Sequence, residues 1–358
     1  MTDTFPHSAE SIDAAWLTRA LRDTGAIAAE TELAEVRIED FAGGFGQTGE
    51  TVRLHLDYSG GAGPKTMIAK FATEDPDRRR ASNAIGLYER EIGFYRHWSE
   101  KVDIRSPRAY FARHDPASGR FALMLEDFPD HRPGDETVGL TPADGRVAIS
   151  QVAGLHGPYW GKMGAADLTP LPLAAPEKYE AAFGVMAETF GDLMTPRLHD
   201  LRSAYLTAIP HLQDWMNSAP ATLIHGDYRL DNLLFGPEGH PDRIVAVDWQ
   251  AIRPARGMQD VAYLIAHSMN VGDRRAHEID LLQLYCTELS RYGVDYDLDT
   301  AKADYRKTQL YLFCVVLYIV GINVNTHERA LRRKRALMTR AITALEDWEA
   351  LDLLSEVA

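Results

Sequence analysis

The sequence predicts an α+β fold in two parts, an N-terminal lobe of mostly antiparallel β structure and a larger helical C-terminal lobe. Short runs typical of strands, separated by glycine-rich turns, dominate from Val36 to about Phe128. Longer runs with helical spacing dominate afterwards. Pro129–Asp135 is polar and contains two prolines, so we expect the crossing between the lobes there. The predicted lobes are residues 1–127 and 128–358, and a length of 358 residues suits two domains.

The elements of the N-terminal lobe follow from local patterns. Ser11–Thr24 and Ala84–Glu100 carry apolar residues at helical spacing and are predicted helices. The predicted strands are Val36–Phe41, Thr51–Tyr58, Thr66–Phe71, Ala109–His114 and Arg120–Leu125. Gly, Pro, Asp and Ser fill the stretches between several of them, as is typical of turns.

Helices dominate the C-terminal lobe. Thr141, Pro142 and Asp144 together predict a helix start, because threonine can cap a first turn in which proline is tolerated. That helix runs towards Trp160. The other predicted helices are Pro176–Thr189, Arg197–Asn217, Asp260–Met269, Asp273–Arg291 and a stretch from Asp299 onwards. A small β region, Ala221–Gln250, interrupts them.

Composition narrows the class of protein. The formal net charge is −14, which opposes a nucleic-acid partner because phosphates call for a basic surface. The longest apolar run, Leu310–Ile322, has 13 residues, fewer than the roughly 20 that a membrane span needs. The N-terminus lacks the pattern of a signal peptide. We therefore expect a cytoplasmic protein without a membrane partner, in which Cys286 and Cys314 are reduced thiols.

The motif that points most directly to chemistry is His225–Asn232, which reads HGDYRLDN. It has the spacing H-x-D-x-x-x-x-N of a phosphotransferase catalytic loop. The residues after it predict a β-hairpin whose second strand ends at Asp248. Antiparallel pairing would bring Asn232 and Asp248 together although 16 positions separate them.

These polar residues suit phosphoryl transfer. Asn232 and Asp248 would offer an amide oxygen and a carboxylate, and Mg²⁺ prefers oxygen ligands. Asp227 would accept a proton from an attacking hydroxyl, or orient it. Arg229 has two open interpretations, as a contact to phosphate or acceptor and as a donor to a backbone carbonyl. His225 is expected to be a hydrogen-bonded structural residue.

Leu223–Asp260 resembles the catalytic core of the aminoglycoside phosphotransferase and choline kinase-like family, small-molecule kinases with a protein-kinase-like fold. The segment is most similar to bacterial phosphotransferases related to ecdysteroid kinases. The resemblance implies that Asp227 is the catalytic base and that Asn232 and Asp248 hold Mg²⁺. Gly226 stands where protein kinases have arginine, which favours a small-molecule acceptor. Asp260 is an expected helix N-cap, and the family suggests that it also braces the catalytic loop.

A glycine cluster precedes the strand Thr51–Tyr58. Gly44, Gly46 and Gly49 fit G-x-G-x-x-G, with Phe45 between the first two. A strand rather than a helix follows this cluster. The pattern therefore favours a strand–loop–strand that covers phosphates, rather than the turn of a Rossmann fold. A plain hairpin turn is the alternative.

Lys70 stands at the end of the predicted strand Thr66–Phe71, like the strand lysine that reaches the α- and β-phosphates in kinases. Its expected partner is a glutamate on the next helix, where Glu89 and Glu91 compete. Glu91 shares a helical face with apolar residues, and the three- and four-residue spacing directs it at the sheet. We therefore predict that Glu91 is the partner.

Adenine contacts are expected at the connection between the lobes, from the backbone of Leu125, Glu126 and Asp127. Two interpretations remain for three further residues, which could line an acceptor pocket or pack in a core: His156, Trp160 and Trp249.

The predicted function is an ATP- and Mg²⁺-dependent phosphotransferase that acts on a hydroxyl of a small molecule. The alternative is a catalytically silent nucleotide- or partner-binding module on the same fold. The acceptor, the choice between ATP and GTP, and the oligomeric state are left open.

Overall fold

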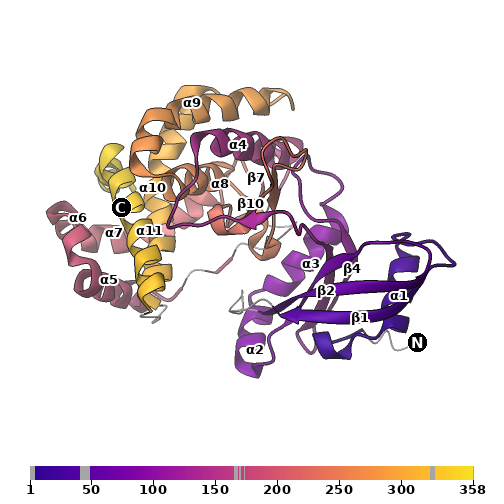
Figure 1. Cartoon of the computed structure of the whole chain (residues 1–358). Helices are drawn as coiled ribbons and strands as arrows, with labels where there is room; N and C mark the ends of the chain where they lie inside the picture. The colour runs from indigo at the N-terminus through magenta and orange to yellow at the C-terminus, as the bar shows by residue number, and fades with distance from the viewer. Residues whose placement is uncertain are drawn as a thin grey trace. The chain divides into compact units, whose positions relative to one another are not determined.

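The structure is a computed structural model that describes residues 5–40, 49–164, 168, 171–172, 174–322 and 327–357. It confirms the predicted α+β class, with a five-stranded antiparallel sheet followed by a mainly helical region (Figure 1). The chain forms two compact units. The first, which we call the sheet unit, comprises Met1–Lys101, Ser106–Arg132 and Val247–Ala251. The second, the helical unit, comprises Val102–Arg105, Pro133–Ala246 and Ile252–Ala358.

The sheet unit is built on one antiparallel sheet of order β1-β2-β3-β5-β4. Its strands are β1 (Glu32–Asp40), β2 (Gly49–Gly60), β3 (Thr66–Ala72), β4 (Ala109–Asp115) and β5 (Arg120–Glu126). Its helices are α1 (Ala14–Asp23), α2 (Pro76–Ala84) and α3 (Leu87–His97), with short 3₁₀ turns at Ala9–Ser11 and Trp249–Ala251. All five strands predicted from the sequence are present, although their ends differ by a few residues.

Alternating side chains of the central strands form the core of this unit. Val52, Leu54 and Leu56 of β2 are buried, and Leu17 and Leu21 of α1 pack in the same cluster. Helix α1 packs against β1 and β4 (Figure 1). This alternation is the period of two that a half-buried strand requires.

The predicted helix Ala84–Glu100 is wrong at its N-terminal end. The chain forms two helices there, α2 and α3, separated by Gly86 at φ +75°. Asp75 accepts hydrogen bonds from the backbone N–H groups of Asp77 and Arg78 and so caps α2. The left-handed backbone at Gly86 costs a residue without Cβ little, and it ends the first helix before the second begins.

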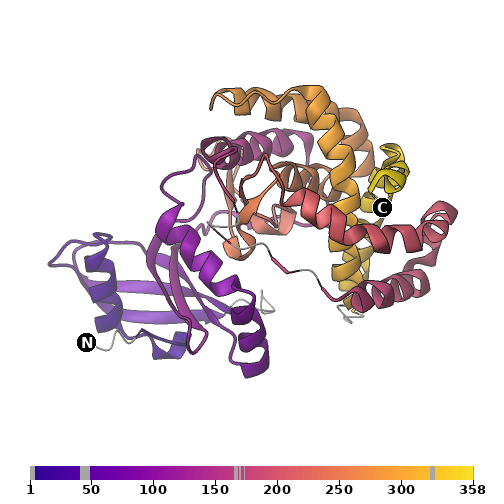
Figure 2. The same ribbon diagram turned by 180° about the vertical axis from the view of Figure 1, so that it is seen from behind.

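The helical unit contains most of the helices of the chain. They are α4 (Pro142–His156), α5 (Pro176–Phe190), α6 (Pro196–Asp200), α7 (Arg202–Met216), α8 (Met258–Ala262), α9 (Val271–Ser290), α10 (Leu298–Ile322), α11 (Glu328–Asp347) and α12 (Leu354–Val357). Helix α4 packs beside α9, and α10 packs against α5 and α11 (Figure 1). The later helices, orange to yellow, are seen from behind in Figure 2. Among the described residues, no helix is long and apolar enough to cross a membrane.

Five short strands complete the structure of the described residues, and two of them flank the loop that contains HGDYRLDN. They are β6 (Arg132–Pro133), β7 (Thr222–Ile224), β8 (Leu233–Phe235), β9 (Ile244–Ala246) and β10 (Arg253–Ala255). The predicted hairpin is confirmed, since β8 pairs antiparallel with β9 and Phe235 lies opposite Ile244. The predicted cap of α4 is confirmed as well, because the Thr141 side chain accepts from the Asp144 N–H at 3.1 Å.

Candidate active site

In the sheet unit, Lys70 of β3 lies between two carboxylates. Its Nζ donates to Glu91 Oε1 at 2.5 Å and to Asp248 Oδ1 at 3.3 Å. The Lys70 side chain is 19% exposed and that of Glu91 is 4% exposed. A cation fixed in this way at the end of a strand can receive a phosphate group.

The orientation of helix α3 determines which of its two glutamates pairs with Lys70. Glu91 is buried on the face that also carries the buried Phe94 and Tyr95, whereas Glu89 is exposed. The pairing of Lys70 with Glu91 is therefore the one that helical spacing predicts. The role of the pair in binding nucleotide stays a prediction.

The charges of this cluster depend on one another. Burial acts to lower the pKa of Lys70, but the carboxylates of Glu91 and Asp248 outweigh it, and the pKa is raised. Burial raises the pKa of Glu91, and Lys70 offsets part of that rise. The lysine therefore keeps its positive charge at neutral pH.

Asp248 follows β9 and belongs to the sheet unit. Its backbone has φ +66°, a left-handed conformation that costs a residue with a Cβ roughly 1–2 kcal/mol. Gln250 Nε2 donates to Asp248 Oδ2 at 3.1 Å. Backbone strain of this kind is concentrated at functional sites, and here it sets the direction of the carboxylate.

Trp249 is a core residue. Its ring is fully buried and stacks on Phe94 of α3, with 3.6 Å between centroids and 4° between planes. The stacking anchors the segment that carries Asp248 against the helix that carries Glu91.

In the helical unit, the loop between β7 and β8 carries HGDYRLDN. Asn232 Nδ2 donates to the carbonyl oxygen of Asp227 at 2.9 Å and to its Oδ2 at 2.8 Å. The amide oxygen of Asn232 therefore points away from Asp227 and can serve as a ligand. The side chain of Asp227 is 29% exposed, so it is accessible to an acceptor.

Asp260 braces this loop from α8. Its carboxylate accepts from the backbone N–H of His225 at 2.7 Å and of Gly226 at 2.9 Å. Gly226 has φ +83°, which suits a residue without Cβ. The predicted helix-cap role is wrong, because α8 begins at Met258 and Gly257 is its N-cap. Asp260 lies inside the helix, where it serves the loop instead.

His156 stands behind Asp260. Its Nε2 lies 3.2 Å from Asp260 Oδ2, and its Nδ1 lies 2.8 Å from the Tyr285 hydroxyl. Burial raises the pKa of Asp260, but its hydrogen bonds, among them those with His156 and the Gly226 N–H, outweigh burial, and the pKa is lowered. His156 is therefore a core residue. His225 is also fully buried, and its Nδ1 accepts from the Asp227 N–H at 3.3 Å.

Arg229 is surrounded by carboxylates. Its Nη1 donates to Glu136 Oε1 at 2.5 Å, and its Nε lies 3.1 Å from Asp227 Oδ1. Asp231 Oδ2 is 3.4 Å from Nη1. The structure thus shows carboxylate partners for Arg229, and its contact to phosphate or acceptor stays a prediction.

The glycine cluster that was predicted to cover the phosphates gives little information about nucleotide binding. Gly44, Phe45 and Gly46 lie outside the described residues. Gly49 opens β2, where a Cβ would collide with the Phe71 carbonyl oxygen, so strand packing alone requires glycine there.

At the predicted adenine contact, the side chains of the connecting segment have other partners. Asp127 pairs with Arg53, whose Nε donates to it at 2.7 Å. Glu126 accepts from the Arg108 N–H at 3.0 Å, and Leu125 is buried. Backbone contacts from this segment to a base stay a prediction, and the Glu126 N–H already donates to the Arg108 carbonyl oxygen at 2.8 Å.

The two predicted Mg²⁺ ligands, Asn232 and Asp248, are both oxygen donors. The described residues contain no cluster of three or more His, Cys, Asp or Glu side chains that could hold a metal. Asn232 and Asp248 offer an amide oxygen and a carboxylate, and Mg²⁺ is commonly held by one or two such groups together with nucleotide phosphates. By their chemistry the two side chains fit that mode of binding, but they belong to different units, so their joint role stays a prediction.

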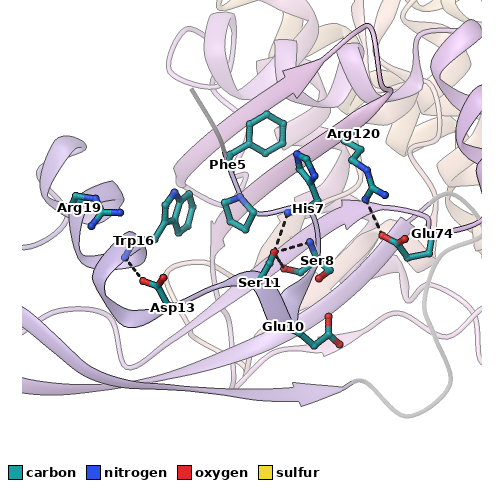
Figure 3. A pocket seen from close by; sticks show the side chains of 11 residues that line it. Phe5, His7, Ser8, Glu10, Ser11, Asp13, Trp16, Arg19, Glu74 and Arg120 are labelled. Atoms are coloured by element: carbon teal, nitrogen blue, oxygen red, sulfur yellow. Dashed lines mark hydrogen bonds and ion pairs between the residues drawn. The ribbon is translucent and has the colours of Figure 1, made fainter. Parts of the chain in front are cut away.

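A cavity of about 590 Å³ lies in the sheet unit, away from this chemistry. Figure 3 shows Phe5, His7, Trp16 and Arg19 around it, with Arg120 donating to Glu74 at 2.9 Å. None of the described residues predicted to bind nucleotide lines it.

Known structures share this architecture. Choline kinase from Cryptosporidium parvum aligns with a TM-score of 0.53 at 9% identity, covering 96% of this chain and 99% of that one. A microcompartment-associated aminopropanol kinase aligns with a TM-score of 0.51 at 16% identity, covering 95% and 98%. A protein from Ralstonia eutropha described as a candidate aminoglycoside phosphotransferase gives 0.51 at 17% identity, covering 94% and 98%. The fold is that of the kinase-like phosphotransferases.

Sequence comparison agrees with the predicted resemblance. The model of the ecdysteroid kinase-like family matches residues 175–294, a segment that contains both HGDYRLDN and Asp248. No curated protein sequence matches the chain. This match agrees with the resemblance to ecdysteroid kinase-related phosphotransferases that the motif suggested, and the structural matches show the fold of aminoglycoside phosphotransferases and choline kinases.

Some residues near the site were not foreseen. Glu136 and Arg333 contact Arg229 or Asp231 but come from distant parts of the sequence. No local pattern marks either residue, because their partners are decided by tertiary packing.

Proposed function

We propose that this protein is an ATP- and Mg²⁺-dependent phosphotransferase that phosphorylates a hydroxyl of a small molecule. The observation that carries the proposal is Lys70 held between Glu91 and Asp248, on a fold shared with small-molecule kinases. Residues 1–127 would bind the nucleotide and residues 128–358 would bind the acceptor.

The residues have distinct roles in this proposal. Lys70 binds the α- and β-phosphates and Glu91 holds it there. Asp227 accepts the proton of the acceptor hydroxyl, whose oxygen bonds to the γ-phosphorus as the bridging P–O bond breaks and ADP leaves. Mg²⁺, held by Asn232 and Asp248, would neutralise phosphate charge.

The class of acceptor is supported by the structural relatives. Two of them are described as kinases of choline and of aminopropanol, which are small alcohols. Gly226 in place of an arginine also favours a small-molecule kinase. A screen of small hydroxyl compounds for phosphate transfer is the direct way to find the acceptor.

Two substitutions test the assignment. Asp248→Ala should abolish the rise in thermal midpoint caused by saturating Mg²⁺–ATP or Mg²⁺–GTP, along with turnover, because it removes a metal ligand. Asp227→Asn should keep that rise and cut transfer of labelled phosphate by about 10²–10⁴-fold, the usual size of general-base catalysis.

Asp214→Asn, an exposed carboxylate of α7, is the matched control and should behave as the unmodified protein does. Unchanged transfer by Asp227→Asn would refute its catalytic role. Nucleotide binding without transfer to any acceptor would favour the silent binding module.

A further inference from the structure

A buried carboxylate lies at the centre of a charge cluster in the helical unit. Glu136 precedes α4, and its side chain is 4% exposed. Its Oε1 accepts from Arg229 Nη1 at 2.5 Å, and its Oε2 accepts from Arg333 Nε at 2.7 Å. One carboxylate thus joins an arginine of the HGDYRLDN loop to an arginine of α11.

Arg333 also contacts the HGDYRLDN loop directly. Its Nη2 donates to Asp231 Oδ2, while its Nε is bound to Glu136. Arg229 in turn contacts Asp227. The cluster therefore holds the loop on both sides of Leu230, next to Asp227 and next to Asn232.

The pairing satisfies charges that would otherwise be costly to bury. Burial raises the pKa of Glu136, but Arg229 and Arg333 outweigh it, and the pKa is lowered. Arg340, also on α11, donates from Nη1 to the backbone carbonyl of Glu136 at 2.8 Å. Removing one partner of a buried ion pair leaves an uncompensated charge, so the loss of Arg229 or Arg333 would leave the Glu136 carboxylate less well satisfied.

The cluster also leaves Arg229 little freedom. Three carboxylates, those of Glu136, Asp227 and Asp231, lie around its guanidinium. A guanidinium engaged in this way is poorly placed to leave for a phosphate. Its contact with Asp227 Oδ1 complements the contact of Asn232 with Oδ2.

We propose that Arg333 and Glu136 are positioning residues, which fix the loop of Asp227 by acting through Arg229 and Asp231. Helix α11 thereby contributes to the active site without contacting the substrate. The inference rests on the proposed function for its effect on catalysis. A displacement of about 1 Å in a reacting group can cost about 10²-fold in rate, so a group that fixes the loop has a measurable effect.

Helix α11 provides a matched control. Arg335 lies two residues beyond Arg333 and pairs with Asp192, which is exposed. The side chains of Arg333 and Arg335 are 42% and 47% exposed. Both variants, Arg333→Gln and Arg335→Gln, remove one charge from the same helix, but only the first loosens the loop.

The experiment compares these variants in the full-length chain by two readouts. Arg333→Gln should lower kcat about 10- to 100-fold while KM for nucleotide stays within about twofold, because the loop is displaced and the nucleotide site is not. Hydrogen exchange at the backbone amides of residues 225–232 should accelerate. Arg335→Gln should change neither kcat nor this exchange.

Equal kcat and equal exchange in the two variants would overturn the proposal. If the unmodified protein transferred no phosphate, the proposed function would fail, and the exchange data alone would decide the role of Arg333. If Arg333→Gln did not fold, Arg333→Lys would replace it, because lysine keeps the charge but cannot form the fork to two carboxylates.

Discussion

The hydroxyl groups of two buried tyrosines have different environments. The hydroxyl of Tyr205 donates to the Leu310 carbonyl oxygen at 2.6 Å. That of Tyr263 is buried with no hydrogen-bond partner among the described residues. Tyr263 belongs to a π-helical turn, Tyr263–Ser268, a rare geometry that is frequent at functional sites.

Substitution by phenylalanine should separate the two. Tyr205→Phe removes one partner of a buried hydrogen bond and should lower the free energy of unfolding by about 1–3 kcal/mol. Tyr263→Phe removes an unpaired hydroxyl and should leave the free energy unchanged or raise it. Urea titration measures both, and a loss for Tyr263→Phe equal to that for Tyr205→Phe would show that its hydroxyl has a partner.

The ion pair of Lys70 can be tested by comparing substitutions of two glutamates of α3. Lys70→Ala and Glu91→Ala should each weaken nucleotide affinity, and each should lower stability by roughly 3 kcal/mol because one buried charge is left alone. Glu89→Ala should change stability by less than about 0.5 kcal/mol, since Glu89 is exposed. Calorimetry with nucleotide and urea titration give the two quantities. A damaging Glu89→Ala beside a silent Glu91→Ala would contradict the pairing.

For single residues, the sequence predicts those contacts that depend on spacing within one helix or strand. Glu91 could be chosen over Glu89 because the three- and four-residue spacing of a helix decides which side chain faces the sheet. The partners of Arg229 could not be chosen, since Glu136 is 93 positions away. Arg333 and Asp231 are likewise 102 positions apart. Only packing brings such residues together.

Among the elements, α4 offers a direct test of helix capping. Thr141 Oγ1 accepts from the Asp144 N–H, so Thr141→Ala should lower the free energy of unfolding by about 1 kcal/mol. The control is Thr207→Ala, at an exposed position in the middle of α7. It should leave the free energy of unfolding unchanged or raise it slightly, since alanine favours helix. Urea titration of both variants makes the comparison, and equal effects would exclude a capping contribution.

The elements also show where sequence patterns are sufficient. The hairpin of β8 and β9 was predictable because two apolar runs flank a turn, but the sequence left Phe235 opposite either Arg243 or Ile244, and the structure pairs it with Ile244. The break between α2 and α3 was not predictable, because α2 is mostly polar and has no apolar stripe that would mark it as a separate helix. For Asp260 the sequence suggested a helix cap and the family resemblance suggested a brace, and the structure shows the brace alone. A carboxylate near a helix start suits both a cap and a brace, and only the fold decides between them.

At the scale of the whole molecule, the two units do not follow a single boundary along the sequence. Val247–Ala251, which contains Asp248, belongs to the sheet unit although the chain on both sides of it belongs to the helical unit. A single cut of the chain would therefore divide a unit. A chain with two units can also unfold in more than one step, so urea titrations should be followed by two probes.

Within the helical unit, His267 links folding to pH. It is 2% exposed, and its Nδ1 has no hydrogen-bond partner among the described residues. Burial, with the charges of Arg340 and Arg274, lowers the pKa of His267 to about 3, although Glu136 opposes the shift. The folded protein therefore keeps this imidazole neutral well below its ordinary pKa.

The sign of the resulting pH dependence follows from proton binding. Between the ordinary pKa near 6.5 and the folded value near 3, the unfolded chain binds a proton that the folded chain does not. The free energy of unfolding should thus fall as pH falls below 6.5, by about 1.4 kcal/mol per pH unit, or about 2 kcal/mol at pH 5. His267→Gln should remove that part of the loss, whereas His211→Gln, at an exposed position of α7, should keep it. Urea titrations at pH 7 and pH 5 give the difference for each protein, and an undiminished loss in His267→Gln would show that His267 is not the group responsible.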